Sequence, residues 1–406
     1  MSTADSIPAS TVTARGASRV RIKLSRDDYA LRTGLVVVIS LLAILVVLPL
    51  YSLLSKSLED MDGNFVGLQN FHEYFQTPAL LNSITNSLSV AFFSAIIVLM
   101  LAFIYAYALT RTQMPFRLFF RGVALIPILA PSLLAAISLI YWFGTQGVLK
   151  SWLFGASIYG PIGVIMASCF WVFPHALMIL ITALSTADAR LYEAAEALRT
   201  PKWRIFWTVT LPGAKYGILS TGFIVFTLVI TDFGVPKVIG GNFNVLATDV
   251  YKQVVGQQNF EMGAVVSLVL LLPAVAAFIA DRWVQSKQVA LLSARAVPFQ
   301  PKSEPLRDWL LFGFCATIAF IFLAMLGMAA YASFVTFWPY NLTLSLNNYD
   351  FDLMDGGGWE AYYNSIRMAI YCAVFGSELI FSGSYLVEKA RGIMWLRNIL
   401  DRKSVV

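Results

Sequence analysis

The chain has 406 residues, of which 58% are hydrophobic and only 13% are charged. Its mean hydropathy is +0.71. Soluble domains are about 45–50% apolar and about 25% charged, so the composition excludes an ordinary soluble protein and indicates that lipid surrounds much of the chain. The net charge is +6 at pH 7, and the position of the basic residues along the chain explains it without nucleic-acid binding.

Eight apolar segments are long enough to cross a bilayer as helices, because about 20 apolar residues span its hydrocarbon core. Residues 1–28 precede them, are rich in Ser, Thr, Ala and Arg, and contain no apolar run. This predicts a disordered tail and no signal peptide. The predicted fold class is an all-α polytopic membrane protein. The expected spans lie near residues 33–55, 84–108, 118–143, 160–184, 216–236, 261–284, 308–335 and 364–387.

The basic residues are distributed unevenly between the two sides of this topology. Of the 29 lysines and arginines, 24 fall in the N-terminal tail and in the segments on the same side, and five fall on the other side. The positive-inside rule places the basic side in the cytoplasm, which predicts a cytoplasmic N-terminus. The positive charge then reflects topology and contact with anionic membrane lipid.

The loop between the fourth and fifth spans, residues 188–215, contains charged, helix-forming sequence. Residues 188–199 are good helix formers. Thr200 can cap a following helix and Pro201 suits its first position, so two short helices at an angle are expected. A solvated amphipathic loop on the bilayer surface is the alternative interpretation. The positions that define the pattern are Glu193, Ala194, Ala195, Arg199, Leu211 and Pro212.

This pattern, Glu-Ala-Ala followed after a gap by Leu-Pro, resembles the coupling loop of ABC-transporter importer permeases. The resemblance implies a MetI-like permease fold in the bacterial inner membrane, with an external (periplasmic) solute-binding protein as a partner. It also implies that a separate cytoplasmic ATPase subunit grips the loop at Glu193, Ala194 and Ala195. Members of this family have Gly at the position of Arg199, and we expect Thr200-Pro201 to make the turn here instead.

Other function classes lack their sequence signals. The chain has no Walker-type GxxxxGK[ST] run and no His, Cys and Asp cluster with metal-ligand spacing. We therefore expect no catalytic residues, no bound metal and no cofactor. A secondary transporter is the alternative class, and it needs charged relay residues in several spans. A membrane enzyme needs clustered His or acidic residues at one membrane face, which the sequence does not have.

Two short motifs recur at one offset of 278 residues. Leu68-Gln69-Asn70-Phe71 recurs as Leu346-Asn347-Asn348-Tyr349, and Asn86-Ser87 recurs as Asn364-Ser365. Two matched motifs at one offset predict an internal duplication, with chance similarity of short polar motifs as the alternative. The second copy has equivalents of the first two spans, and a complete copy would extend roughly 150 residues beyond this chain.

The repeat sets the expected domain organisation. The first permease unit is expected over residues 29–290, a cytoplasmic linker over 291–306, and the start of a second, truncated unit over 307–400. The last six residues, 401–406, match what a widely used sequencing adapter encodes when it is read through to a stop codon. We therefore expect these six residues to be non-native, with an ordinary polar tail as the alternative.

The two-copy layout resembles the fused permeases of the ferric-iron, thiamine and phosphonate group. Residues 232–251, which begin Asp-Phe-Gly-Val-Pro-Lys, are most similar to permeases assigned to 2-aminoethylphosphonate. The resemblance therefore implies 2-aminoethylphosphonate as the substrate. Ferric iron, or thiamine or another small solute, is the alternative.

Three residues at membrane depth are candidates for the substrate path, because ionisable groups there often serve function. They are Asp232, Glu378 and His175. Asp232 could instead lie in interfacial water, and Glu378 could pair with a neighbouring helix. His175 follows Pro174, so a hydrogen-bonded residue at a helix kink is the alternative for it.

Overall fold

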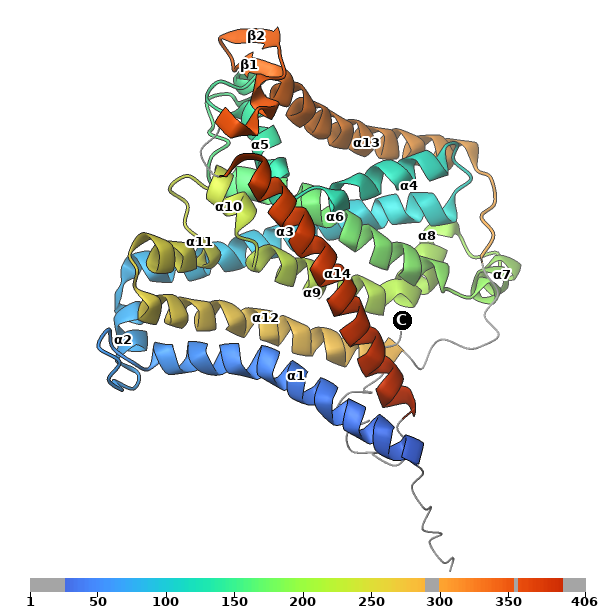
Figure 1. Ribbon diagram of the computed structural model, residues 1–406. Coiled ribbons are helices and arrows are strands. Elements are labelled where there is room, and N and C mark those ends of the chain that lie inside the picture. The colour runs from blue at the N-terminus through green and yellow to red at the C-terminus, as the bar shows by residue number, and fades with distance from the viewer. Residues whose placement is uncertain (1–25, 289–298, 354–356, 390–406) are drawn as a thin grey trace, which may run out of the picture. The chain divides into compact units, whose positions relative to one another are not determined.

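The computed structural model describes residues 26–288, 299–353 and 357–389 (Figure 1). By packing, the chain forms two compact units, residues 50–355 and residues 1–49 with 356–406. The expected tail of residues 1–28 lies almost wholly outside the described residues, as do residues 401–406. The boundaries of the two expected permease units, at residues 290 and 307, were inferred from the sequence repeat and stay predictions.

The larger unit is built from helices and one small hairpin. Its strands β1 (Val335–Phe337) and β2 (Asn341–Leu344) pair antiparallel. The helices are α2 (Gln69–Gln76), α3 (Pro78–Arg111), α4 (Arg117–Leu125), α5 (Ser132–Phe143), α6 (Pro161–Ser185), α7 (Ala189–Ala197), α8 (Lys202–Ile205), α9 (Leu211–Ile230), α10 (Gly234–Ile239), α11 (Leu246–Tyr251), α12 (Phe260–Gln288) and α13 (Pro305–Phe334). The last turns of α1 (Arg26–Ser57) also belong to this unit.

Within the described residues, seven helices are long and apolar enough to cross a membrane, and an eighth span arises if one bent pair is counted. That pair is the predicted third span, 118–143, which is not a single helix. Its two parts meet at an angle of 103° between Leu129 and Ser132. Proline has no N–H and pushes the preceding residue into an extended conformation, and Ala130 before Pro131 has φ −100° and ψ 141°.

The bent pair crosses the bundle from one end to the other. Arg111, the last residue of α3, donates to the carbonyl of Leu184 at the end of α6 with a distance of 2.7 Å. The ends of α3 and α6 therefore lie at one end of the bundle. The chain between them must travel to the far end before α6 returns, and α4 with α5 is that connection. With this pair counted as one broken span, the described residues contain eight candidate membrane spans, the number that the sequence predicts.

The fifth span differs from the prediction at both ends. Its membrane helix stops at Ile230, and residues 234–239 form the separate helix α10. At the other end, α8, a π-helical turn at Phe206–Thr210 and α9 form one continuous helix, Lys202–Ile230. Pro212 cannot donate a backbone hydrogen bond, and the wider π turn directly before it accommodates the missing bond. The expected second short helix is therefore the first part of a spanning helix.

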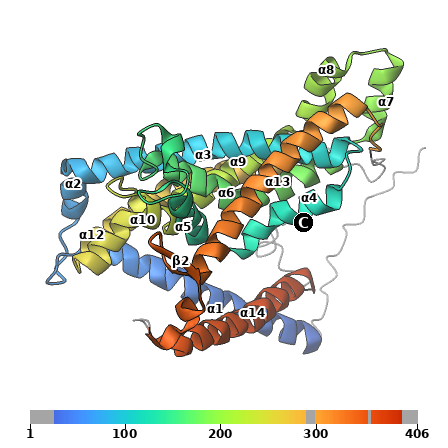
Figure 2. The same cartoon turned by 90° about the horizontal axis from the view of Figure 1, so that it is seen from above.

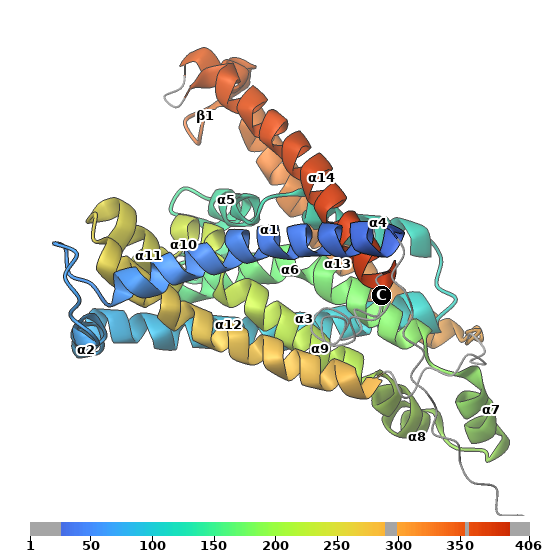
Figure 3. The ribbon, with the colours of Figure 1, turned by 60° about the horizontal axis from the view of Figure 1, so that its bottom comes forward.

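The core of the larger unit forms where α3, α6 and α9 pack against one another, and α12 packs along α9 (Figure 3). Small residues let these helices approach closely, as is common in membrane bundles. At the crossing of α6 and α9, a Cβ atom added to Gly217 would lie 2.3 Å from the Cβ of Ala183. On another side of the core, α13 runs along α4 and α5 (Figure 2). Its Phe322 packs edge-on against Phe170 and Phe173 of α6, with centroid distances of 4.9 and 5.1 Å.

The smaller unit contains the first part of α1 and the helix α14 (Gly358–Lys389). The two helices touch at small residues, where a Cβ on Gly383 would lie 3.3 Å from Val38 and one on Gly34 would lie 3.4 Å from Leu386. In the apolar 18-residue stretch of each helix, 6% of the residues or fewer are buried. Such apolar surface suits contact with lipid or with another helix.

Candidate functional site

The helix α7 is the central element of the candidate site, and the structure confirms the helix expected over residues 188–199. Asp188 begins it, and its carboxylate accepts a hydrogen bond from the Arg190 N–H at 3.1 Å. Such a cap satisfies one of the free donors at a helix start. In the larger unit α7 and α8 lie at the opposite end of α3, α9 and α12 from α2 and α11 (Figures 1 and 3).

The turn after α7 is made by Arg199 itself, not by Thr200-Pro201 as expected. Arg199 has φ +52°, in the left-handed region that glycine prefers. Its N–H donates to Glu196 O at 2.8 Å, and the Thr200 N–H donates to Ala195 O at 3.0 Å. This pair of bonds is the Schellman motif. Arg199 therefore adopts a conformation that glycine would adopt with less strain. Pro201, not Thr200, holds the capping position of α8.

Replacing Arg199 by glycine is expected to stabilise the protein by about 1 kcal/mol, because a residue with a Cβ is strained in the left-handed conformation. The greater flexibility of glycine in the unfolded chain offsets part of this gain. Thermal unfolding of the detergent-solubilised protein measures the change. Arg204→Gly is the control, since Arg204 is exposed within a helix and its replacement should destabilise. A fall in the melting temperature for Arg199→Gly would contradict the assigned turn.

One face of α7 is buried and the other is open. Ala189 and Tyr192 are its buried residues, and the Tyr192 hydroxyl donates to Thr210 Oγ1 at 3.1 Å. Glu193 and Ala194 are exposed, and Ala195 is half-buried. The apolar side chains that remain accessible on α7 and on the helix after it are Leu191 (58% exposed), Leu198 (80%), Trp203 (68%) and Trp207 (60%). This exposed apolar set suits a protein partner.

The other two predicted positions of the pattern lie in the continuous helix Lys202–Ile230. There Leu211 is half-buried and Pro212 is exposed. They follow the π-helical turn that bears Thr210, the partner of Tyr192. Residues of the pattern therefore lie on both elements that meet at the Tyr192–Thr210 contact, α7 and the helix of the fifth span.

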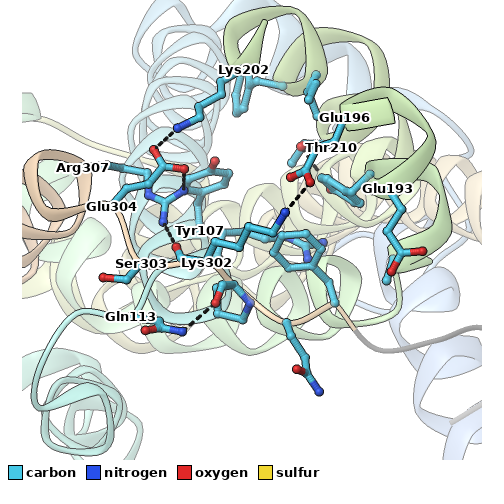
Figure 4. A pocket seen from close by; sticks show the side chains of 18 residues that line it. Tyr107, Gln113, Glu193, Glu196, Lys202, Thr210, Lys302, Ser303, Glu304 and Arg307 are labelled. Atoms are coloured by element: carbon cyan, nitrogen blue, oxygen red, sulfur yellow. Dashed lines mark hydrogen bonds and ion pairs between the residues drawn. The ribbon is translucent and has the colours of Figure 1, made fainter. Parts of the chain in front are cut away.

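A cavity of about 800 Å³ lies beside α7 and is lined by α7, α8, the end of α3 and residues 299–307 (Figure 4). Lys302 forms an ion pair with Glu196 of α7, and this hydrogen bond raises the pKa of the Lys302 ammonium group. Lys202 of α8 pairs with Glu304 at 2.6 Å. The cavity thus has ion-paired walls, and Glu193 forms part of its rim.

Residues 299–307 were not predicted as part of this site, because the sequence suggested only a linker over 291–306. One signal could have indicated more. Phe299 is the single aromatic residue in that linker, and an aromatic residue in a polar connector often has a packing partner. Residues 291–298 of the linker lie outside the described part of the chain.

Asp232, a candidate for the substrate path, has a structural role. Its carboxylate accepts hydrogen bonds from Ser132 Oγ at 2.9 Å and from the Val235 N–H at 3.0 Å. It therefore ties the start of α10 to the start of α5. Burial raises the pKa of Asp232, and the two hydrogen bonds partly oppose that rise.

The remaining two path candidates lie elsewhere. His175 is half-buried on α6, and its ring lies edge-on to Trp171 with a centroid distance of 5.9 Å. Its Nδ1 has no hydrogen-bond partner among the described residues. Glu378 belongs to the smaller unit and is exposed on α14. In the part of the chain that the structure describes, no group of His, Cys, Asp and Glu could hold a metal ion.

Comparisons with known proteins agree with this architecture. Residues 99–289 match the family model described as binding-protein-dependent transport system inner membrane component. The chain is 26% identical to the putative ferric transport system permease protein FbpB 1 of Haemophilus influenzae, over 92% of this chain and 61% of the relative. It is 25% identical to the ferric transport system permease protein FbpB of Actinobacillus pleuropneumoniae, over 86% of this chain and 52% of the relative.

Among solved structures, the chain is similar to a bacterial ABC transporter involved in the import of the acidic polysaccharide alginate. The TM-score is 0.51 at 15% identity, over 66% of this chain and 97% of that one. The predicted fold, an all-α polytopic membrane protein of the importer-permease type, is confirmed. The chain spans about half to three fifths of the length of the two ferric permease relatives.

Proposed function

We propose that this chain is a permease subunit of an ABC importer, which passes a solute from an external binding protein across the bacterial inner membrane. In this proposal a separate ATPase subunit grips α7 and drives transport. The observation that carries the proposal is the open face of α7, where Glu193 and Ala194 are exposed next to Leu191 and Leu198. A short, projecting helix with accessible apolar side chains is costly in water unless a partner covers it. The family match over residues 99–289 includes this segment.

The ATPase must bind on the cytoplasmic side, so the topology is a direct test. A reporter fused after Lys215 is expected to be cytoplasmic, and one fused at Asp350 is expected to be external. The reason is that 24 of 29 basic residues fall on the side of α7. Paired phosphatase and fluorescent-protein fusions at both positions measure this. Reporters on the same side would contradict the eight crossings, and reversed sides would contradict the ATPase site.

For the substrate, we propose ferric iron in place of 2-aminoethylphosphonate. Two relatives that align over most of this chain are named ferric transport permeases. The phosphonate expectation rested on residues 232–251, where the Asp232 carboxylate accepts hydrogen bonds from Ser132 and Val235. Phosphonate stays the alternative.

Deletion of the gene in its host is expected to abolish uptake of radiolabelled ferric iron and to leave growth on 2-aminoethylphosphonate as sole phosphorus source unchanged. Complementation with the wild-type gene is the control. Loss of growth on the phosphonate with normal iron uptake would reverse the assignment. If neither iron uptake nor growth on the phosphonate is lost, both substrate assignments are wrong. The permease class is then tested by co-purification of the ATPase with the Glu193→Arg variant.

We also propose that the chain contains two related permease units, and local geometry supports this. Asn70 Nδ2 donates to Ser57 O at 3.0 Å and to Glu59 O at 2.8 Å. Asn348, at the offset of 278, donates to Ser333 O at 3.1 Å and to Val335 O at 2.8 Å. Each asparagine thus closes the hairpin that follows a spanning helix. The shared motif therefore has a shared structural role in both places.

A further inference from the structure

Arg111 connects three separate elements at the α7 end of the bundle. It is the last residue of α3 and is only 3% exposed. Its Nη2 donates to Leu184 O, at the end of α6, at 2.7 Å. Its guanidinium carbon lies 4.8 Å from the ring centroid of Tyr192 in α7 and 4.3 Å from that of Phe299. One side chain therefore touches two spanning helices, α7 and the segment before α13.

The arginine has no carboxylate partner among the described ion pairs, and its Nε is buried without a hydrogen-bond partner. A buried charge without an opposite charge is destabilising unless other groups compensate it. The two aromatic rings and the Leu184 carbonyl are the compensating groups here. Losing either ring would remove part of this compensation, so Arg111 favours the arrangement in which Tyr192 of α7 and Phe299 lie side by side.

The segment Phe299–Arg307 is fixed at several points. The Phe299 ring lies 4.6 Å from that of Tyr192, and Gln113 Nε2 donates to Pro301 O at 2.8 Å. Lys302 pairs with Glu196 of α7, as Figure 4 shows. Arg307, in the first turn of α13, donates to Lys302 O at 2.8 Å. The segment thus joins α7, the residues after α3 and the start of α13.

We propose that Arg111, Tyr192, Phe299, Glu196 and Lys302 form a clamp that transmits displacement of α7 to α3 and α6. The proposal rests on the proposed function, since the displacement would come from the ATPase. Ala189 and Tyr192 are the buried residues of α7, so the contacts of Tyr192 are the main packing that joins this helix to the bundle. Without the clamp, the short connection between α6 and α7 would absorb the movement. Arg111 is a positioning residue, because it acts through Tyr192.

The variants Arg111→Lys and Phe299→Ala test the clamp. Lysine keeps the charge but loses the planar guanidinium that lies against both rings. The purified complex of permease, ATPase and binding protein is placed in liposomes, and ATP hydrolysis and solute uptake are measured together. We expect ATP hydrolysis within about twofold of wild type and a drop of roughly tenfold in solute transported per ATP. Arg121→Lys, at an exposed arginine of α4, is the matched control and should change neither quantity.

The conservative variant Phe299→Trp, which keeps an aromatic ring over Arg111, is expected to restore most of the uptake per ATP that Phe299→Ala loses. A merely structural role would lower the amount of complex and leave this ratio unchanged. If the complex with the Arg111→Lys permease does not assemble, the comparison of Phe299→Ala with Phe299→Trp still tests the clamp. A wild-type ratio for Phe299→Ala, or no recovery with Trp, would overturn the clamp. Normal transport by Glu193→Arg would instead contradict the ATPase site on α7.

Discussion

Replacing Glu193 by arginine is expected to abolish transport while the protein still accumulates in the membrane. Glu193 is exposed on α7, and arginine and glutamate have similar helix propensities, so the helix should persist. In the proposed complex the substitution puts a bulkier side chain of opposite charge where the ATPase closes around the Ala-rich helix. Truncating one partner of a buried, hydrogen-bonded charge pair at an interface costs about 2–5 kcal/mol, and we expect reversal of the Glu193 charge to weaken ATPase binding by a similar amount.

Co-purification of the ATPase with the wild-type and variant permease measures this effect, together with solute uptake. Glu73→Arg is the matched control, since Glu73 is also exposed but belongs to α2 at the opposite end of the bundle. It should leave ATPase recovery and uptake unchanged. Equal recovery and full uptake for Glu193→Arg would show that α7 is not the coupling element.

Replacing Gly217 by alanine is expected to destabilise the larger unit by about 1–3 kcal/mol, the usual cost of overpacking a core. The added Cβ would lie 2.3 Å from the Cβ of Ala183, so α6 and α9 would have to move apart. Elsewhere in a helix, glycine to alanine is favourable by about 0.5–1 kcal/mol. A loss of stability in Gly217→Ala would therefore come from the close crossing of α6 and α9 and not from helix propensity.

Thermal unfolding and size-exclusion chromatography in detergent measure the effect. Gly213→Ala on the same helix is the control, because no atom lies within 4 Å of its added Cβ, and it should raise stability slightly. The pair Gly217→Ala with Ala183→Gly moves the methyl group to the other helix and should recover most of the loss. A single Gly217→Ala variant as stable as wild type would contradict the close crossing of α6 and α9.

The candidate site could be found in part from the sequence. The helix at residues 188–199 was predictable, because its residues favour helix through local interactions alone. The turn after it was assigned to the wrong residues. Local rules give the left-handed conformation to glycine, whereas here Arg199 adopts it, because the two hydrogen bonds of the Schellman motif and the path into α8 require it.

The sequence by itself determined the composition class, the approximate positions of the eight crossings and the location of α7. These depend on runs of apolar residues and on helix propensity, which are local properties. Tertiary structure decided that the helix continues through Pro212 and that Asp232 links α10 to α5. The bend before Pro131 follows instead from the local effect of proline. Tertiary structure also brought together the residues of the proposed clamp. Arg111, Tyr192 and Phe299 are far apart in the chain, and only the packing of the folded chain brings a buried cation against two rings.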